Sequence, residues 1–176
     1  MTHLRSAFDR LDVRLTRWTA RHGITLLRVS VAIVFLWFGL LKFFPGRSPA
    51  QDLAARTIGA LSGGLVPATV SVPALAVLET AIGLGLLFGA WLRATLLLLF
   101  LQMVGTVTPL FLFPRETFTV FPFAPTLEGQ YILKNVVLVT AAIVIGSTVR
   151  GGLLIADPAV AREARSREAN GGEIVT

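Results

Sequence analysis

The sequence predicts an all-α integral membrane protein, a four-helix bundle with an N-terminal amphipathic interfacial helix and a short helix in its first outer loop. Of the 176 residues, 54% are hydrophobic and the mean hydropathy is +0.74, both too high for a soluble domain of this length. Apolar stretches of about twenty residues recur, the length at which a helix crosses the hydrocarbon core. The arginines cluster at the ends of these stretches and in the tails, as membrane anchors do.

Three segments are expected along the chain: a basic amphipathic helix at 1–22, a four-span domain at 23–150 and a charged, flexible cytoplasmic tail at 151–176. In the first segment, apolar residues recur at helical spacing, and most arginines lie off their face. That apolar stripe comprises Leu4, Phe8, Leu11, Leu15 and Trp18. A helix of this kind lies on an anionic membrane surface, and docking onto a partner protein is the alternative.

The predicted spans cover 24–44, 70–90, 94–113 and 129–149. Between the first two, Ser48-Pro49-Ala50-Gln51 is a capping-box pattern that predicts a short helix before Gly63-Gly64. The link at 91–93 is so short that the second and third spans must be antiparallel neighbours. We expect Pro109 to kink the third span.

Segment 114–128 is too proline-rich for a helix and too apolar for a free loop. Its Phe118, Phe121 and Phe123 suit a lid over the bundle, or plain aromatic anchoring among the headgroups. With four spans, one side of the membrane holds the N-terminal arginines, Arg93 and the arginines of the tail. The positive-inside rule therefore places both termini in the cytoplasm, with the chain in a bacterial-type inner membrane.

Composition excludes several kinds of chemistry. Cysteine is absent, which removes disulfides, thiolate catalysis and iron–sulfur clusters. His3 and His22 both precede the first span, so histidines cannot hold a haem within the bundle. No metal-ligand cluster or nucleophile–base pair is apparent, so the sequence indicates no catalytic residue, no metal site and no stand-alone enzyme. The net charge of +6 reflects membrane topology, since no basic patch alternates with aromatics as nucleic-acid binding requires.

Polar residues inside the spans are the candidate site. Charges within a membrane usually face the bundle interior and pair, and Lys42, Glu79 and Lys134 all fall in its outer half. Gln102, Thr106 and Asn135 complete the predicted ligand-binding set. Four helical stripes are expected to line the bundle axis: Arg28, Ala32, Phe35, Gly39 and Lys42; Val72, Ala76, Glu79 and Gly83; Thr95, Leu99, Gln102, Thr106 and Pro109; Gln130, Lys134, Val137 and Ala141.

Two lysines facing one glutamate leave a positive surplus, unless Glu128 neutralises it. That surplus suggests an acceptor-rich ligand: a quinone carbonyl, a lipid headgroup or a small anion. The alternatives are a proton relay and a buried ion pair that only fixes the packing.

Several of these motifs resemble the DoxX-like superfamily of small four-span bacterial membrane proteins. Leu27-Arg28 and the run Trp37–Phe43 resemble its first span, and Glu79–Leu84 fits its second. The run Gly129–Asn135 is similar to the fourth-span motif of the YkgB-like branch, which is associated with reactive chlorine resistance. The resemblance covers about 26–151 and includes Arg28, Gly39, Lys42, Glu79 and Lys134. It implies links to oxidative stress, and some superfamily members are described as membrane subunits of thiosulfate:quinone oxidoreductases.

The leading hypothesis is an accessory or ligand-binding component of redox or oxidative-stress physiology. It would bind a quinone or small anion in an outward-opening pocket beneath the phenylalanine lid, with no cofactor other than that quinone. One alternative is a small-molecule or proton-coupled transporter. Another is a structural or assembly partner that docks through its basic N-terminal helix. Expected partners are the lipid bilayer and either a membrane protein or a second copy of the chain.

Overall fold

The computed structural model describes residues 2–44, 46–48 and 51–169. Within this part of the chain, four helices are long and apolar enough to cross a membrane: Leu11–Leu41, Ala68–Phe88, Leu92–Leu112 and Leu127–Ser147. The predicted class of an all-α, multi-pass membrane protein is confirmed. The chain divides into two compact units. One unit is Leu27–Val149, and the other consists of the N-terminal residues up to Leu26 together with the C-terminal residues from Arg150 onward.

Helix α1 spans Thr2–Leu41, and its first part belongs to the unit formed by the two ends of the chain. This unit also contains all of helix α8, Pro158–Ala169. Helix α1 passes through Gly23 without a break, so the predicted interfacial helix and first span are consecutive parts of one helix. A single helical glycine costs only about 1 kcal/mol, and no proline interrupts the run. Leu11, Leu15 and Trp18 of the apolar stripe are exposed, whereas Leu4 is not among the residues whose side chains the structure describes.

Helix α8 lies within the segment that was predicted as a charged, flexible tail. Its alanines, arginines and glutamates are good helix formers, and Pro158 occupies a position at which the missing N–H costs nothing. The Asp157 carboxylate accepts a hydrogen bond from the Ala159 N–H at 2.8 Å, which satisfies one free donor of the first turn. Residues 170–176 of the tail lie outside the described residues.

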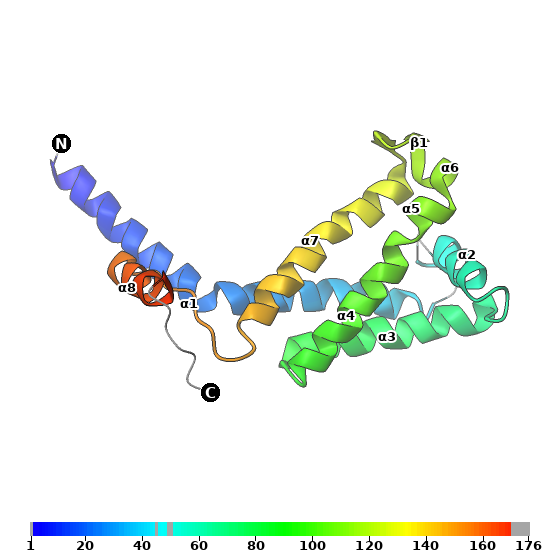
Figure 1. The fold of residues 1–176 in the computed structure, drawn as a ribbon, viewed down its shortest axis with the longest axis horizontal. Coiled ribbons are helices and arrows are strands. Elements are labelled where there is room, and N and C mark those ends of the chain that lie inside the picture. Colours follow the sequence, from blue (N-terminus) through cyan, green and yellow to red (C-terminus); the bar gives the residue numbers. More distant parts are fainter. Residues whose placement is uncertain (1, 45, 49–50, 170–176) are drawn as a thin grey trace. The chain divides into compact units, whose positions relative to one another are not determined.

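The unit Leu27–Val149 is organised around an antiparallel helical hairpin. Helix α3, Ala68–Phe88, turns tightly into α4, Leu92–Val107, as the short link predicted (Figure 1). Gly89 and Trp91 both adopt left-handed backbone conformations in this turn, with φ of 68° and 45°. Arg28 of α1 donates to the Leu86 carbonyl at 3.0 Å, where the last carbonyls of α3 lack helical partners. Helix α4 ends at Val107, and α5, Pro109–Leu112, follows after Thr108, so the irregularity falls at the position where a kink was expected.

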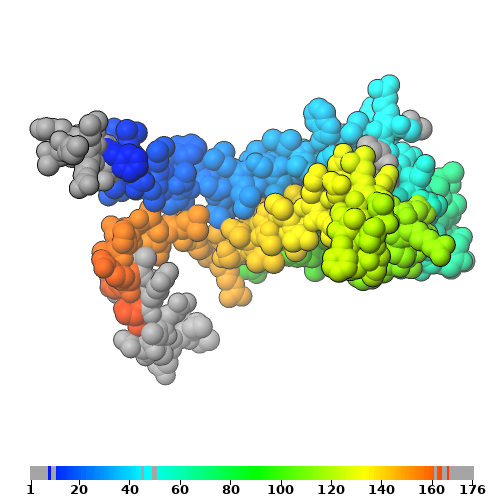
Figure 2. Space-filling model, turned by 90° about the horizontal axis from the view of Figure 1, so that it is seen from above, coloured from blue at the N-terminus to red at the C-terminus, as the bar shows by residue number. Residues whose placement is uncertain are grey.

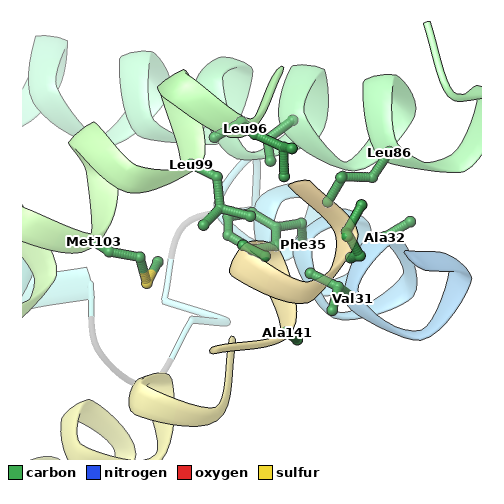
Figure 3. Packing of buried hydrophobic residues seen from close by; sticks show 11 residues of the cluster. Val31, Ala32, Phe35, Leu86, Leu96, Leu99, Met103 and Ala141 are labelled. Atoms are coloured by element: carbon green, nitrogen blue, oxygen red, sulfur yellow. The ribbon is translucent and has the colours of Figure 1, made fainter. Parts of the chain in front are cut away.

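The core of this unit is packed through small and branched residues of four helices. Ala32, Ala76 and Ala142 are fully buried, which lets the helices approach closely, as membrane helices do. Figure 3 shows Phe35 from α1 among Leu86 from α3 and Leu96 and Leu99 from α4. The predicted stripes of the first three spans are the buried ones.

The stripe predicted for the fourth span is wrong over most of its length. In α7, Leu127–Ser147, the buried residues are Gly129, Ile132, Ala141, Ala142 and Ile145. Gln130, Lys134 and Val137 are exposed instead. The prediction placed Lys134 inside because of its charge. A long lysine side chain near a span end can reach the polar interface without facing a partner helix.

One end of the unit is covered by a cap, which we define as α2, α6 and the strands β1 and β2. Helix α2, Gln51–Leu61, confirms the predicted loop helix and buries Leu53 and Thr57; Pro49 and Ala50 of the capping pattern lie outside the described residues. Helix α6, Pro114–Thr117, corrects the expectation of no helix in this segment. Proline favours the first helical position, so the prolines of this segment do not exclude a helical turn that begins at Pro114.

The strands β1, Phe118–Val120, and β2, Ala124–Pro125, form an antiparallel pair. Figure 2 shows this yellow-green region at the molecular surface beside the yellow atoms of α7. The Thr126 N–H donates to the Thr117 carbonyl at 2.9 Å, and Gly129 lies so close to that carbonyl that a side chain there would collide with it. The hairpin is therefore held against the start of α7.

A two-pronged ion pair joins α2 to α6. The guanidinium of Arg56 donates to both carboxylate oxygens of Glu116, at 2.8 and 2.6 Å, and lies over the Phe113 ring. These hydrogen bonds, with the charge of Arg56, lower the pKa of Glu116. Both side chains are about half exposed, so screening by water keeps the energetic contribution small.

The cap should therefore loosen in acid. Because the folded-state pKa of Glu116 is depressed, its stabilising contribution is present above the unfolded value of about 4.3 and is lost as the pH falls through the lower folded value. Amide hydrogen exchange of α2, corrected for intrinsic rates, should show protection falling between pH 5 and pH 3. Because the contribution of the pair is small, Glu116→Gln should show slightly reduced protection already at pH 5, whereas Glu128→Gln should retain the wild-type drop. A drop that persists in Glu116→Gln contradicts this assignment.

Candidate polar site

Three polar side chains from α1, α3 and α4 meet around one carboxylate. Lys42, directly after the last residue of α1, places its Nζ 2.6 Å from Oε2 of Glu79 in α3. Gln102 of α4 donates from Nε2 to the other oxygen, Oε1, at 2.7 Å. Of the six residues in the predicted set, the structure thus brings together Lys42, Glu79 and Gln102.

Close packing of α1 against α3 brings Lys42 within reach. A Cβ atom added at Gly39 would lie 2.8 Å from the Thr80 backbone nitrogen, and one at Gly83 would lie 2.9 Å from that of Leu36. Separations this short leave no space for a side chain, so both glycines are required by the helix crossing. Lys42 follows Gly39 by about one helical turn and therefore faces Glu79 of the same contact.

The cluster is buried and its charges balance. The side chains of Lys42 and Glu79 are 10% and 11% exposed, and the pair consists of one ammonium and one carboxylate. Within the described residues, Glu79 accepts from two donors, as a buried carboxylate requires. The structure thus gives no positive surplus at Glu79.

Hydrogen-bonding capacity remains free beside the pair. Oε1 of Gln102 and Oγ1 of Thr80 are buried and find no partner among the described residues. Lys42 carries three donors, and its acceptors are Glu79 and the Phe38 carbonyl, the latter at a long 3.4 Å. Among the described residues, the cluster therefore retains acceptor oxygens and a lysine donor that lack a partner. Thr80 was not predicted, although it follows Glu79 directly in the sequence.

The remaining predicted site residues lie elsewhere. Thr106 donates to the Gln102 carbonyl at 3.0 Å, so it supports the helix that carries Gln102. Lys134 is exposed, and its Nζ lies 5.3 Å from the centre of the Tyr131 ring, so the expected meeting of Lys134 with Glu79 does not occur. Asn135 is half-buried on the inner side of α7, and Glu128 is exposed in its first turn.

A separate cavity of about 450 Å³ lies at the predicted phenylalanine lid. Leu110, Phe111, Pro114, Phe118 and Phe121 form its apolar wall, and Arg115 and Thr119 contribute polar atoms. Lys42, Glu79 and Gln102 are not among its lining residues. The lid cavity and the polar cluster are two distinct features, where the sequence suggested one pocket.

Comparison with known proteins gives one family and one short relationship. The model of the DoxX family matches residues 23–114, more than half of the chain, and this range includes Lys42, Glu79 and Gln102 but not Lys134. The inner membrane protein RclC of Escherichia coli (strain K12) is 70% identical over 23 residues, which are 13% of this chain and 12% of RclC. No solved structure matches.

Proposed function

The chain belongs to the DoxX family, and from this premise we propose that it is an accessory, ligand-binding membrane protein of redox or oxidative-stress physiology. One observation carries the proposal. A lysine, a glutamate and a glutamine from three helices meet inside an apolar bundle, and hydrogen-bonding atoms among them remain unused. Buried polar atoms without partners are rare because each costs about 1–3 kcal/mol, and they are often found where a ligand binds.

The unused atoms favour a neutral ligand with oxygen substituents over an anion. The balanced pair of Lys42 and Glu79 supplies no net charge to hold an anion, and Lys134 is exposed over Tyr131 and makes no ion pair with Glu79 among the described residues. A quinone carbonyl would accept from the remaining donor of Lys42. A hydroquinone hydroxyl would donate to Oε1 of Gln102. We therefore propose a quinone as the ligand of this site, with Thr80 as a further contact.

The proposed setting is a bacterial-type inner membrane with both termini in the cytoplasm. The distribution of arginines supports this orientation, and the similarity to an inner membrane protein supports the compartment. The cap then faces the outer side, and Lys42 and Glu79 lie in the outer half of the bilayer.

Quinone binding is tested by thermal unfolding of the full chain in detergent with decylubiquinone. A ligand that binds only the folded state raises the melting temperature. At a ligand concentration about one hundred times Kd, the free energy of unfolding increases by about 2.7 kcal/mol. Gln102→Leu removes the free acceptor and should weaken binding about three- to tenfold, as expected for one hydrogen bond. Gln130→Leu, which changes an exposed glutamine of α7, should bind as wild type.

Two results would count against the quinone site. One is a wild-type melting temperature that decylubiquinone does not raise. The other is an equal shift in wild type and Gln102→Leu, which would place the quinone away from the polar cluster.

A further inference from the structure

The lid cavity has the dimensions of a ligand site and an aromatic wall. Its volume of about 450 Å³ falls in the range of about 300–1,000 Å³ typical of small-molecule pockets. The side chain of Phe118 is 9% exposed, whereas those of Phe111 and Phe121 are 75% and 62% exposed. Phe118 and Phe121 meet edge to face with their ring centres 5.2 Å apart. The wall therefore combines the buried ring of Phe118 with accessible aromatic rings that pack beside it.

A single cationic group lies among these apolar residues. Arg115 belongs to α6 and is exposed, and it makes no ion pair or hydrogen bond with any side chain that the structure describes. The neighbouring arginine of the cap, Arg56, has its charge neutralised by Glu116. The cavity thus combines an apolar wall with one uncompensated positive charge.

The lining residues lie at the end of the third span, and this position matches the division between apolar wall and charge. The third span ends at Leu112, and Arg115 follows three residues later, where the chain leaves the hydrocarbon core. Phe111 is the last residue but one of this apolar span, and side chains at such a position face acyl chains close to the headgroups. Arginine at this depth meets lipid phosphates, with which a guanidinium forms paired, charge-assisted hydrogen bonds.

We propose that the lid cavity binds one anionic phospholipid of the outer leaflet. Its phosphate is held by Arg115, and the first part of an acyl chain lies along Phe111, Phe118 and Phe121. Free phosphate would leave the aromatic wall unused, and an uncharged hydrocarbon would leave Arg115 unpaired. Only an anionic amphiphile satisfies both parts of the cavity. This inference does not depend on the quinone site, because the two share no residue.

Native mass spectrometry of the full chain, titrated with phosphatidylglycerol in detergent, tests the proposal. A one-to-one adduct should form more readily than with phosphatidylcholine, whose positive choline group competes for the phosphate. Arg115→Ala should weaken phosphatidylglycerol binding about tenfold, as expected for the loss of a charge-assisted hydrogen bond. Arg47→Ala, which removes an exposed arginine of the same charge outside the cavity, should change it less than twofold.

The aromatic wall is tested with a second pair of variants. Phe121→Ala should weaken the adduct several-fold, whereas Phe123→Ala, at an 85% exposed position outside the cavity, should not. Circular dichroism of each variant checks that its helices are intact. Equal losses of phosphatidylglycerol binding in Arg115→Ala and Arg47→Ala would show that the lipid is attracted by the overall positive charge, and would overturn the proposal. Displacement of the lipid by equimolar inorganic phosphate, with no effect of Phe121→Ala, would show a simple anion site and overturn it as well.

Discussion

Lys42→Met is expected to destabilise the folded bundle by about 3–5 kcal/mol, the cost typical of breaking a buried ion pair. Among the described residues the carboxylate of Glu79 has two partners, and this substitution leaves Gln102 as the one that remains. Because the surroundings are apolar helices rather than water, no solvent replaces the lost ammonium. Reversible unfolding in mixed micelles measures the difference in the free energy of unfolding.

The matched control is Lys134→Met, which removes the same charge from an exposed position over Tyr131. It should change the free energy of unfolding by no more than about 0.5 kcal/mol. The double variant Lys42→Met with Glu79→Leu should recover most of the loss, since replacing a whole buried pair by apolar residues is often neutral. Equal effects of the two single lysine variants would mean that Lys42 is not the partner of Glu79.

Gly39→Ala is expected to cost about 1–3 kcal/mol, although alanine is the better helix former by up to about 1 kcal/mol. The added methyl group would lie 2.8 Å from the Thr80 nitrogen and 2.9 Å from Cβ of Glu79, and the first of these is backbone that cannot rotate away. The α1 and α3 helices must then separate, which also carries Lys42 away from Glu79. The variant should therefore lose both stability and decylubiquinone binding.

Gly105→Ala provides the comparison, because a Cβ at Gly105 meets nothing within 4 Å. This variant should be neutral or more stable by up to about 1 kcal/mol, through helix propensity alone. A Gly39→Ala protein as stable as Gly105→Ala would show that the α1–α3 contact is looser than described.

The spans and the polar pair are predictable because strong, local rules determine them. Apolar length identifies each span, the brief turn around Trp91 forces a hairpin, and a charge inside a membrane requires a partner. Lys42 and Glu79 followed from the last rule, and the glycines beside them from close helix packing. The partners of Gln102 were less certain, since one mid-span glutamine has several neighbours within reach.

The orientation of α7 and the structure of the cap depend on information that the sequence carries only weakly. A hydrophobic helix in lipid has little amphipathic contrast, so the predicted face depends on the stripe that contains Lys134, and an interfacial lysine is a poor guide. The hairpin of β1 and β2 is held by the hydrogen bond to the Thr117 carbonyl and by the close approach of Gly129 to it. No periodic pattern in the sequence predicts these contacts. Separating the lid cavity from the polar cluster likewise required three-dimensional coordinates.

The pairing of Lys42 with Glu79 inside the bundle is tested most directly by solid-state NMR of the full chain in lipid bilayers. Dipolar transfer between lysine ¹⁵Nζ and glutamate ¹³Cδ reports contacts of a few ångströms, and the Nζ–Oε2 separation of 2.6 Å predicts strong transfer between Lys42 and Glu79. Lys134 should show no transfer to Glu79. Transfer to Glu79 from Lys134 and none from Lys42 would contradict both the packing of α1 on α3 and the site built upon it.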